Sequence, residues 1–191
     1  MNYEYIRQKV KSNISNKRFK HSLGVVEYAI YLAEKYNCDK EKAKIAAISH
    51  DCAKEMDIDT LVKIAKLHEL KLDEVTLSEP HLLHGPVGSV IAQEELGIED
   101  EEILNAIKYH TTGRTNMTKL EKIIYLSDVV ELNRNYDGIE EVRRLSETDL
   151  DGAILLSIDK IIKYVISINS LLHPRTIEAR NFIMLEKKRR S

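Results

Sequence analysis

The stretch ISHDCAKEM, residues 48–56, places a histidine beside an aspartate in a run that otherwise has the pattern of a buried helix. Asp51 follows Ala47, and His50 follows Ala46, at four-residue steps, so both pairs are expected on one helix face. A charged aspartate on such a face is costly unless it is paired or bound to a metal ion. The small alanines leave space beside the His–Asp pair, which indicates that something is bound in front of it.

Apolar residues recur at three- and four-residue spacing along the chain, and strand-type alternation is not sustained anywhere. The 191 residues include only seven glycines and three prolines, and this length fits one domain. The pattern predicts an all-α protein, a single-domain helical bundle over residues 1–191. The predicted helices span residues 3–14, 17–36, 40–54, 58–70, 86–96, 100–110, 119–132, 149–172 and 175–188.

Several predicted helix ends carry a physical signal. Asp39 can cap a helix by accepting backbone N–H bonds, and Thr118 with Glu121 forms a capping box. Pro86 suits the first turn of its helix, where its missing N–H is harmless. Gly97 follows that helix as a left-handed stop.

Composition and charge narrow the classes of partner. The net charge of -2 gives no electrostatic case for nucleic-acid or membrane binding, so a polyanion would have to meet a local basic cluster. Only two cysteines occur, which fits a reducing compartment. The N-terminal residues lack the apolar core of a signal peptide, and no apolar run is as long as a membrane span. We therefore expect a cytoplasmic protein.

Ionisable side chains lie on apolar stripes of other predicted helices as well. Taken together, these candidates are His21, His50, Asp51, His84, His110 and Asp128. A single histidine on an apolar stripe is more often a hydrogen-bonded core residue than a ligand, and His68 has the same pattern. The two buried aspartates favour a metal site over core histidines, because nothing in their helices is placed to neutralise them.

Five segments carry a family resemblance: RFKHSLGV, SHDCAK, LLHGPVGS, YHTTGRTNMTKLEKIIYLSDVVELNR and LHPRTIEARN, between Arg18 and Asn181. The order H…HD…H…H…D on helices resembles the HD-domain superfamily of metal-dependent phosphohydrolases. The local strings are most similar to one branch, the YqeK family of symmetrical dinucleoside tetraphosphatases. The HD pair alone is unspecific, whereas HGPVG, HTTGR with LEKIIYLSD, and LHPRTIEARN in this order are very specific. The core motifs span 18–134, and the helices over 149–188 are expected to complete the site.

Members of that family cleave diadenosine tetraphosphate into two ADP molecules and carry a di-iron centre. The resemblance implies one metal ion held by His21, His50, Asp51 and Asp128. It implies a second metal ion, bridged by Asp51 and held by His84 and His110. The pair would be divalent or mixed-valence, most simply iron, and the imidazole–carboxylate set also suits manganese or zinc. The chain departs from the family pattern at DVVELNRNYDG, residues 128–138, where two prolines are expected.

Hydrolysis of a phosphoanhydride needs a nucleophile near neutral pH, and bound metal lowers the pKa of water from about 15.7 to roughly 7. Our hypothesis is that hydroxide activated by two metal ions attacks the β-phosphorus. A carboxylate has two oxygens and can bridge both ions, which suits Asp51. The expected catalytic residues are Asp51, Lys54, His84 and His110, with the general acid unassigned.

The substrate implied by the resemblance is a small dinucleoside polyphosphate, which carries several negative charges. Cations therefore matter where they lie next to expected ligands, although each arginine alone is better explained as an exposed charge. The last predicted helix adds an N-terminus that favours anions. The expected substrate contacts are Arg18, Lys54, His84, His110, Thr111, Arg134, His173, Arg175, Thr176 and Arg180.

Several alternatives stay open from the sequence. Another HD-type enzyme, namely a nucleotidase, a deoxynucleotide triphosphohydrolase or a cyclic-dinucleotide phosphodiesterase, would use the same ligands. A non-catalytic metal or nucleotide sensor would keep the site without turnover, and a helical scaffold with core histidines would hold no metal. The sequence also leaves open whether the chain forms a homodimer.

Overall fold

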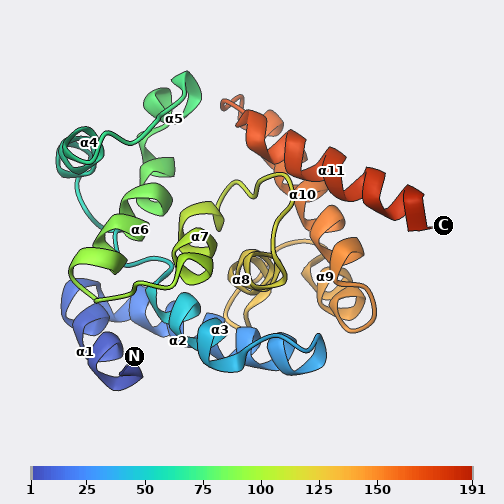
Figure 1. Ribbon diagram of the computed structural model, residues 1–191. Coiled ribbons are helices and arrows are strands. Elements are labelled where there is room, and N and C mark those ends of the chain that lie inside the picture. Colours follow the sequence, from blue (N-terminus) through green and yellow to red (C-terminus); the bar gives the residue numbers. More distant parts are fainter. Residues whose placement is uncertain (1, 191) are drawn as a thin grey trace.

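The computed structural model describes residues 2–190 as eleven α-helices and one 3₁₀-helix, with no strand among these residues (Figure 1). This confirms the predicted all-α helical bundle. The elements are α1 (Tyr3–Asn13), α2 (Asn16–Lys35), α3 (Lys40–Ser49), α4 (Ile58–Leu67), α5 (Glu74–Ser78), the 3₁₀-helix η1 (Pro80–Leu83), α6 (His84–Glu94), α7 (Glu101–Tyr109), α8 (Lys119–Val130), α9 (Ile139–Ser146), α10 (Leu150–Ser167) and α11 (Pro174–Arg190).

Helix α8 is the centre of the bundle and is seen end-on near the middle of Figure 1. It packs against α2, α3, α7 and α10. The consecutive residues Ile123, Ile124 and Tyr125 point to different sides of α8 and are all fully buried. A helix that is apolar nearly all round must be surrounded by others, because each buried side chain of this size contributes about 1.5–3 kcal/mol.

The four helix-end signals found in the sequence agree with the structure. The Asp39 side chain caps α3, and Thr118 with Glu121 forms the capping box of α8. Gly97 follows α6 with a φ of 68°, the left-handed conformation that glycine adopts without strain. Pro86 is the third residue of α6, inside the first turn, where no intrahelical N–H bond is lost.

The third predicted helix is longer than the observed helix α3. It was expected over residues 40–54, but α3 ends at Ser49. The backbone N–H groups of Cys52 and Lys54 bond to carbonyls three residues earlier, so the chain continues as tight turns instead of an α-helix. His50 and Asp51 therefore lie in a turn and not on the face of a helix, which corrects the geometry expected from their spacing.

Three short elements were not predicted: α5, η1 and α9. The first two have only five and four residues, too few for a helical period to be recognised. Helix α9 starts after Gly138, which has no side chain to cap it, and its apolar residues Ile139 and Val142 are sparse. The missed elements thus lack the signals on which the sequence analysis depends.

Helix α10 is the longest apolar helix and ends at Ser167, five residues before its predicted end at 172. Its first half is buried, whereas Tyr164 and Ile166 near its end are exposed. Charged residues such as Asp159 interrupt its sequence. Among residues 2–190, no helix has both the length and the apolar character needed to cross a membrane.

Candidate metal centre

Three buried histidines occupy the same local position in the fold. His50, His84 and His110 each directly follow the last residue of a helix, namely α3, η1 and α7. In each ring, Nδ1 lies 2.5–2.7 Å from the backbone carbonyl oxygen three residues earlier. A carbonyl oxygen only accepts hydrogen bonds, so it holds the proton on Nδ1 and leaves the lone pair on Nε2. All three Nε2 atoms are thereby prepared to bind a cation.

A fourth histidine is oriented by a carboxylate. His21 lies in the second turn of α2, and its Nδ1 is 3.1 Å from Oε1 of Glu131, the residue directly after α8. The other oxygen of Glu131 accepts the backbone N–H and the side-chain amide of Asn133 at 2.7 and 2.8 Å. Burial alone would raise the pKa of Glu131, but these donors and His21 outweigh it and lower the pKa. Glu131 therefore stays ionised and fixes the His21 ring.

Asp51 lies between the histidines and presents one oxygen to each side. Its Oδ2 is 3.3 Å from Nε2 of His50 and 3.8 Å from Nε2 of His21. Its Oδ1 is 3.4 Å from Nε2 of His84 and 3.5 Å from Nε2 of His110. The same carboxylate thus faces two separate pairs of imidazole nitrogens.

Asp128, in the last turn of α8, completes one side of this arrangement. Its Oδ1 lies 2.9 Å from Nε2 of His21 and 3.8 Å from Nε2 of His50. We call the full set the histidine–aspartate cluster: His21, His50, Asp51, His84, His110 and Asp128. Within it, three groups of three ligand atoms lie within 4.8 Å of one another, as a metal site requires.

The donor atoms of the cluster fit divalent metal ions. The buried Nε2 atoms of His21 and His50 lie near aspartate oxygens but receive no hydrogen bond. The Nε2 atoms of His84 and His110 face each other at 3.1 Å, and both carry lone pairs when Nδ1 is protonated. Burial lowers the pKa of His84 to about 4, so a proton is a poor cation for this position at neutral pH. Imidazole nitrogen and carboxylate oxygen together suit iron, manganese or zinc.

Two arginines form ion pairs with the aspartates of the cluster. Arg18 of α2 donates to Oδ2 of Asp51 at 2.8 Å, and Arg134 donates to Oδ1 of Asp128 at 2.7 Å. Burial alone would raise the pKa of both carboxyls, but the neighbouring histidines outweigh it and hold each pKa well below its usual range. Both aspartates are therefore ionised and available as ligands. Arg18 and Arg134 lie next to the cluster, where the sequence analysis expected them.

Lys54 lies beside the second pair of histidines. Its Nζ is 3.4 Å from both ring nitrogens of His84. Burial lowers the pKa of this lysine, because no carboxylate bonds directly to it and the charged form loses hydration. Lys54 therefore lies next to the cluster, and its contact with substrate stays a prediction. Thr111 directly follows His110 and is partly exposed.

His173, directly before α11, and the predicted contacts on α11 have polar partners away from the cluster. Nε2 of His173 lies 3.0 Å from the Asp73 carboxylate, and its Nδ1 accepts the backbone N–H of Arg175. Arg180 is paired with Asp159 of α10, and Thr176 is buried. These contacts hold α11 in place, and a role in substrate binding stays a prediction. Arg175 also lies 5.9 Å from the centre of the Tyr109 ring, so α11 reaches the end of α7.

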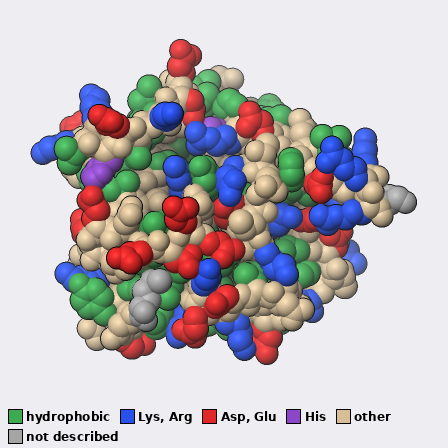
Figure 2. All heavy atoms as spheres, in the orientation of Figure 1, with side chains coloured by type: hydrophobic (Ala, Val, Ile, Leu, Met, Phe, Trp, Pro, Cys, Tyr) green, Lys and Arg blue, Asp and Glu red, His purple; other side chains and the backbone are tan. Residues whose placement is uncertain are grey.

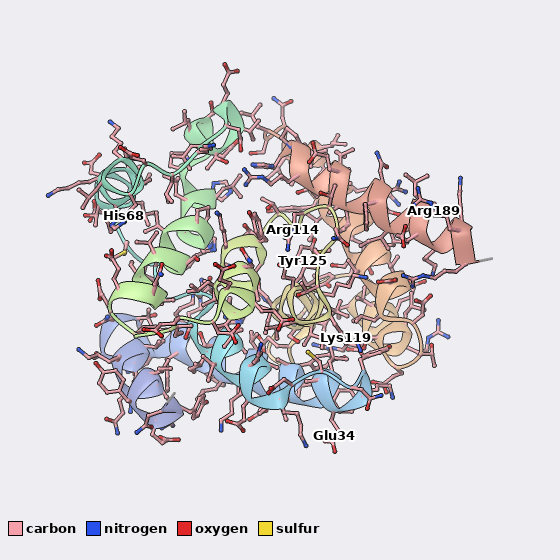
Figure 3. The ribbon with its side chains drawn as sticks, in the orientation of Figure 1. Glu34, His68, Arg114, Lys119, Tyr125 and Arg189 are labelled. Carbon is pink, nitrogen blue, oxygen red and sulfur yellow. The ribbon has the colours of Figure 1, made fainter. Side chains whose placement is uncertain are left out.

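His68, which the sequence analysis considered, and Arg114 lie apart from the cluster. His68 follows α4 at the edge of the bundle, where its Nε2 is 3.5 Å from Glu94 (Figure 3). Arg114, also labelled in Figure 3, uses Nε and Nη2 to bind the buried carboxylate of Glu121 at 3.0 and 2.6 Å. Arg114 thus anchors the loop before α8. The sequence pattern of His68 resembled that of the ligands, and only its packing separates it from them.

The sequence analysis missed Glu131, and a glycine explains how it reaches His21. Gly24 lies one turn after His21 on α2, and a Cβ there would collide with the Glu131 carboxylate and lie 3.0 Å from the Asn133 amide nitrogen. The absence of a side chain at Gly24 therefore lets the carboxylate approach α2 closely. The only sequence feature that could have indicated Glu131 is that it is an acidic residue three positions after Asp128.

Replacing Gly24 with alanine is expected to lower metal affinity about tenfold, at the low end of the effect of disturbing an outer partner of a ligand. The alanine displaces Glu131 and loosens His21, although alanine favours a helix by about 1 kcal/mol. Titration with Mn²⁺ in a calorimeter measures the affinity. Gly88→Ala on α6 is the matched control, because its nearest neighbours lie 3.6 Å from the added Cβ. Equal affinities in both variants would contradict the role of Gly24.

Comparison with known proteins adds independent findings. The HD domain family model matches residues 18–133. The chain is 42% identical to the symmetrical bis(5'-nucleosyl)-tetraphosphatase of Halalkalibacterium halodurans, over 98% of this chain and 100% of that protein. It is 40% identical to the protein of the same name from Bacillus subtilis, over 96% and 98% of the two chains. A Clostridium acetobutylicum crystal structure, described as a predicted HD superfamily hydrolase involved in NAD metabolism, has a TM-score of 0.94 and 43% identity, covering 97% of this chain and 98% of that one.

Proposed function

Because this chain belongs to the HD domain family and, within it, to the family of symmetrical bis(5'-nucleosyl)-tetraphosphatases, we propose that it hydrolyses diadenosine tetraphosphate into two ADP molecules. The chain is a metal-dependent hydrolase. The observation that carries the proposal is the position of Asp51, whose two oxygens face two separate pairs of histidine nitrogens. A cluster built around one shared carboxylate suits a dinuclear centre.

In this proposal, two metal ions occupy the cluster. His21, His50, Asp128 and Oδ2 of Asp51 would hold one of them. His84, His110 and Oδ1 of Asp51 would hold the other. When bound, such ions supply a nucleophile near neutral pH, by lowering the pKa of water from about 15.7 to roughly 7, and neutralise phosphoryl oxygens. Iron is the expected metal, with manganese or zinc as alternatives that the donor set also accepts.

The reaction adds one water across one phosphoanhydride bond. A P–O bond forms at one β-phosphorus, the bond from that phosphorus to the central bridging oxygen breaks, and the second diphosphate leaves with that oxygen. Arg18, Arg134 and Lys54 surround the cluster and would stabilise charge on the phosphates. Arg18 and Arg134 are paired with the carboxylates of Asp51 and Asp128, and metal ions held by those carboxylates would leave both arginines able to bind phosphate.

The test is metal analysis of anaerobically prepared protein followed by product identification. We expect about two metal ions per chain, the number that a dinuclear centre requires. With diadenosine tetraphosphate, chromatography should show ADP as the sole nucleotide product. ATP and AMP in equal amounts would contradict symmetrical cleavage. Binding without turnover in the metal-loaded protein would instead support a sensor, and metal-free protein would support a helical scaffold.

A further inference from the structure

A cavity of about 610 Å³ opens beside the histidine–aspartate cluster. Its lining includes His21 of the cluster and comes from the start of α2, the turn after α3 and the segment after α8. This volume lies within the range of pockets that hold small molecules, about 300–1,000 Å³. The cavity is therefore large enough for part of a nucleotide and adjoins the proposed site of cleavage.

Four of the residues that line this cavity are cations: Lys17, Arg18, Lys20 and Arg134. Arg18 and Arg134 bond to the carboxylates of the cluster, as described above. Lys17 and Lys20 are exposed, lie three residues apart on α2, and pair with no carboxylate of residues 2–190. Residues at this spacing are neighbours on a helix surface, so the two ammonium groups can act on one ligand.

The acidic residues that line the cavity are already occupied. The carboxylate of Glu55 accepts the backbone N–H and the hydroxyl of Ser15 at 2.6 and 2.7 Å. Glu131 is held by His21 and Asn133. On the face of the molecule shown in Figure 2, Lys and Arg side chains are interspersed with Asp and Glu. The unpaired lysines of the cavity are thus available to a negatively charged ligand.

We infer that this cavity binds the half of the substrate that lies beyond the cleaved bond, with Lys17 and Lys20 in contact with its two phosphates. The inference rests on the proposed function, since cleavage at the central anhydride leaves a nucleoside diphosphate on each side of the cluster. Two phosphates beyond the cleaved bond match two cations that pair with no carboxylate in the described part of the chain. A substrate with only one phosphate beyond that bond forfeits one of these contacts, so the lysine pair favours the tetraphosphate.

The test is reversal of both charges in Lys17→Glu/Lys20→Glu, with steady-state kinetics on diadenosine tetraphosphate. We expect KM to rise by about tenfold or more, with the loss concentrated in KM, and the difference to shrink at high salt. Lys63→Glu/Lys66→Glu is the matched control, because these exposed lysines have the same spacing on α4 and do not line the cavity. Equal KM values in the two double variants would overturn the inference.

A binding measurement separates this inference from the proposed function. The probe is a dinucleoside tetraphosphate with methylene in place of the central bridging oxygen, titrated into metal-loaded protein. Weaker binding only in the Lys17/Lys20 variant supports the cavity, even if the wild type proves unable to hydrolyse the natural compound. Equal binding in both double variants overturns the inference while leaving hydrolysis untouched. Loss of probe binding already in the wild type overturns both.

Discussion

Replacing Asp51 with asparagine is expected to abolish metal retention and hydrolysis together. Asparagine has the same shape but only one oxygen, and its amide nitrogen carries no lone pair for a metal ion. One of the two histidine pairs would therefore face an N–H group in place of an anionic oxygen. Loss of an outer partner of a ligand already costs about 10–100-fold, so loss of a shared ligand should exceed about 100-fold in kcat/KM.

Two measurements on the same preparation check this result. Elemental analysis reports the metal content, and product formation from diadenosine tetraphosphate reports the activity. Asp59→Asn is the matched control, because Asp59 is exposed in the first turn of α4 and lies outside the cluster. Circular dichroism shows whether the variant keeps its helices. An Asp51→Asn protein that is folded, metal-loaded and fully active would refute the assignment of Asp51 as the shared ligand.

Replacing Glu131 with alanine is expected to weaken metal binding by about 10–100-fold, the usual effect of removing the partner that orients a metal-binding histidine. The alanine frees His21 to rotate and leaves the N–H groups of Asn133 without their acceptor. Glu131→Gln should fall between the wild type and the alanine variant. A glutamine keeps one acceptor oxygen, but its NH₂ group must face either His21 or Asn133.

This graded order separates orientation of His21 from a simple loss of stability. Calorimetric titration with Mn²⁺ gives the affinity, and thermal melting of the metal-free proteins gives the stability. Glu141→Ala on α9 serves as the control, since Glu141 is exposed and is not part of the cluster. If the alanine and glutamine variants bind Mn²⁺ as tightly as the wild type, Glu131 does not position the ligand.

Much of the fold could be predicted because the sequence signals of a helix are local. The three- to four-residue apolar period located the long helices, and Asp39, Thr118 and Glu121 marked their starts through bonds to backbone N–H groups nearby in the chain. The same period identified His50 as a candidate ligand, because an ionisable side chain in an otherwise buried run is costly unless it has a binding partner.

The parts that were missed depend on contacts between distant segments. The end of α3 at Ser49 is one example, because a helical pattern continues through residue 54 and gives no stop signal. Glu131 is another, since an acidic residue at the end of a helix is normally exposed, and it is buried here only because Gly24 lets α2 approach it. In the sequence, Lys17 and Lys20 have the pattern of ordinary surface lysines. Only the structure shows that they line a cavity together with the segment after α8.

The helical class, most helix starts and the six candidate ligand side chains could be predicted from the sequence, because burial periodicity and helix capping act over only a few residues. Tertiary structure alone decided that Asp51 turns one oxygen toward His21 and His50 and the other toward His84 and His110. These atoms come from four segments of the chain, namely α2, the turn after α3, the start of α6 and the residue after α7, so their positions depend on how those segments pack. The spacing of residues along the chain does not determine these distances, so the geometry of the site depends on the packing of the helices.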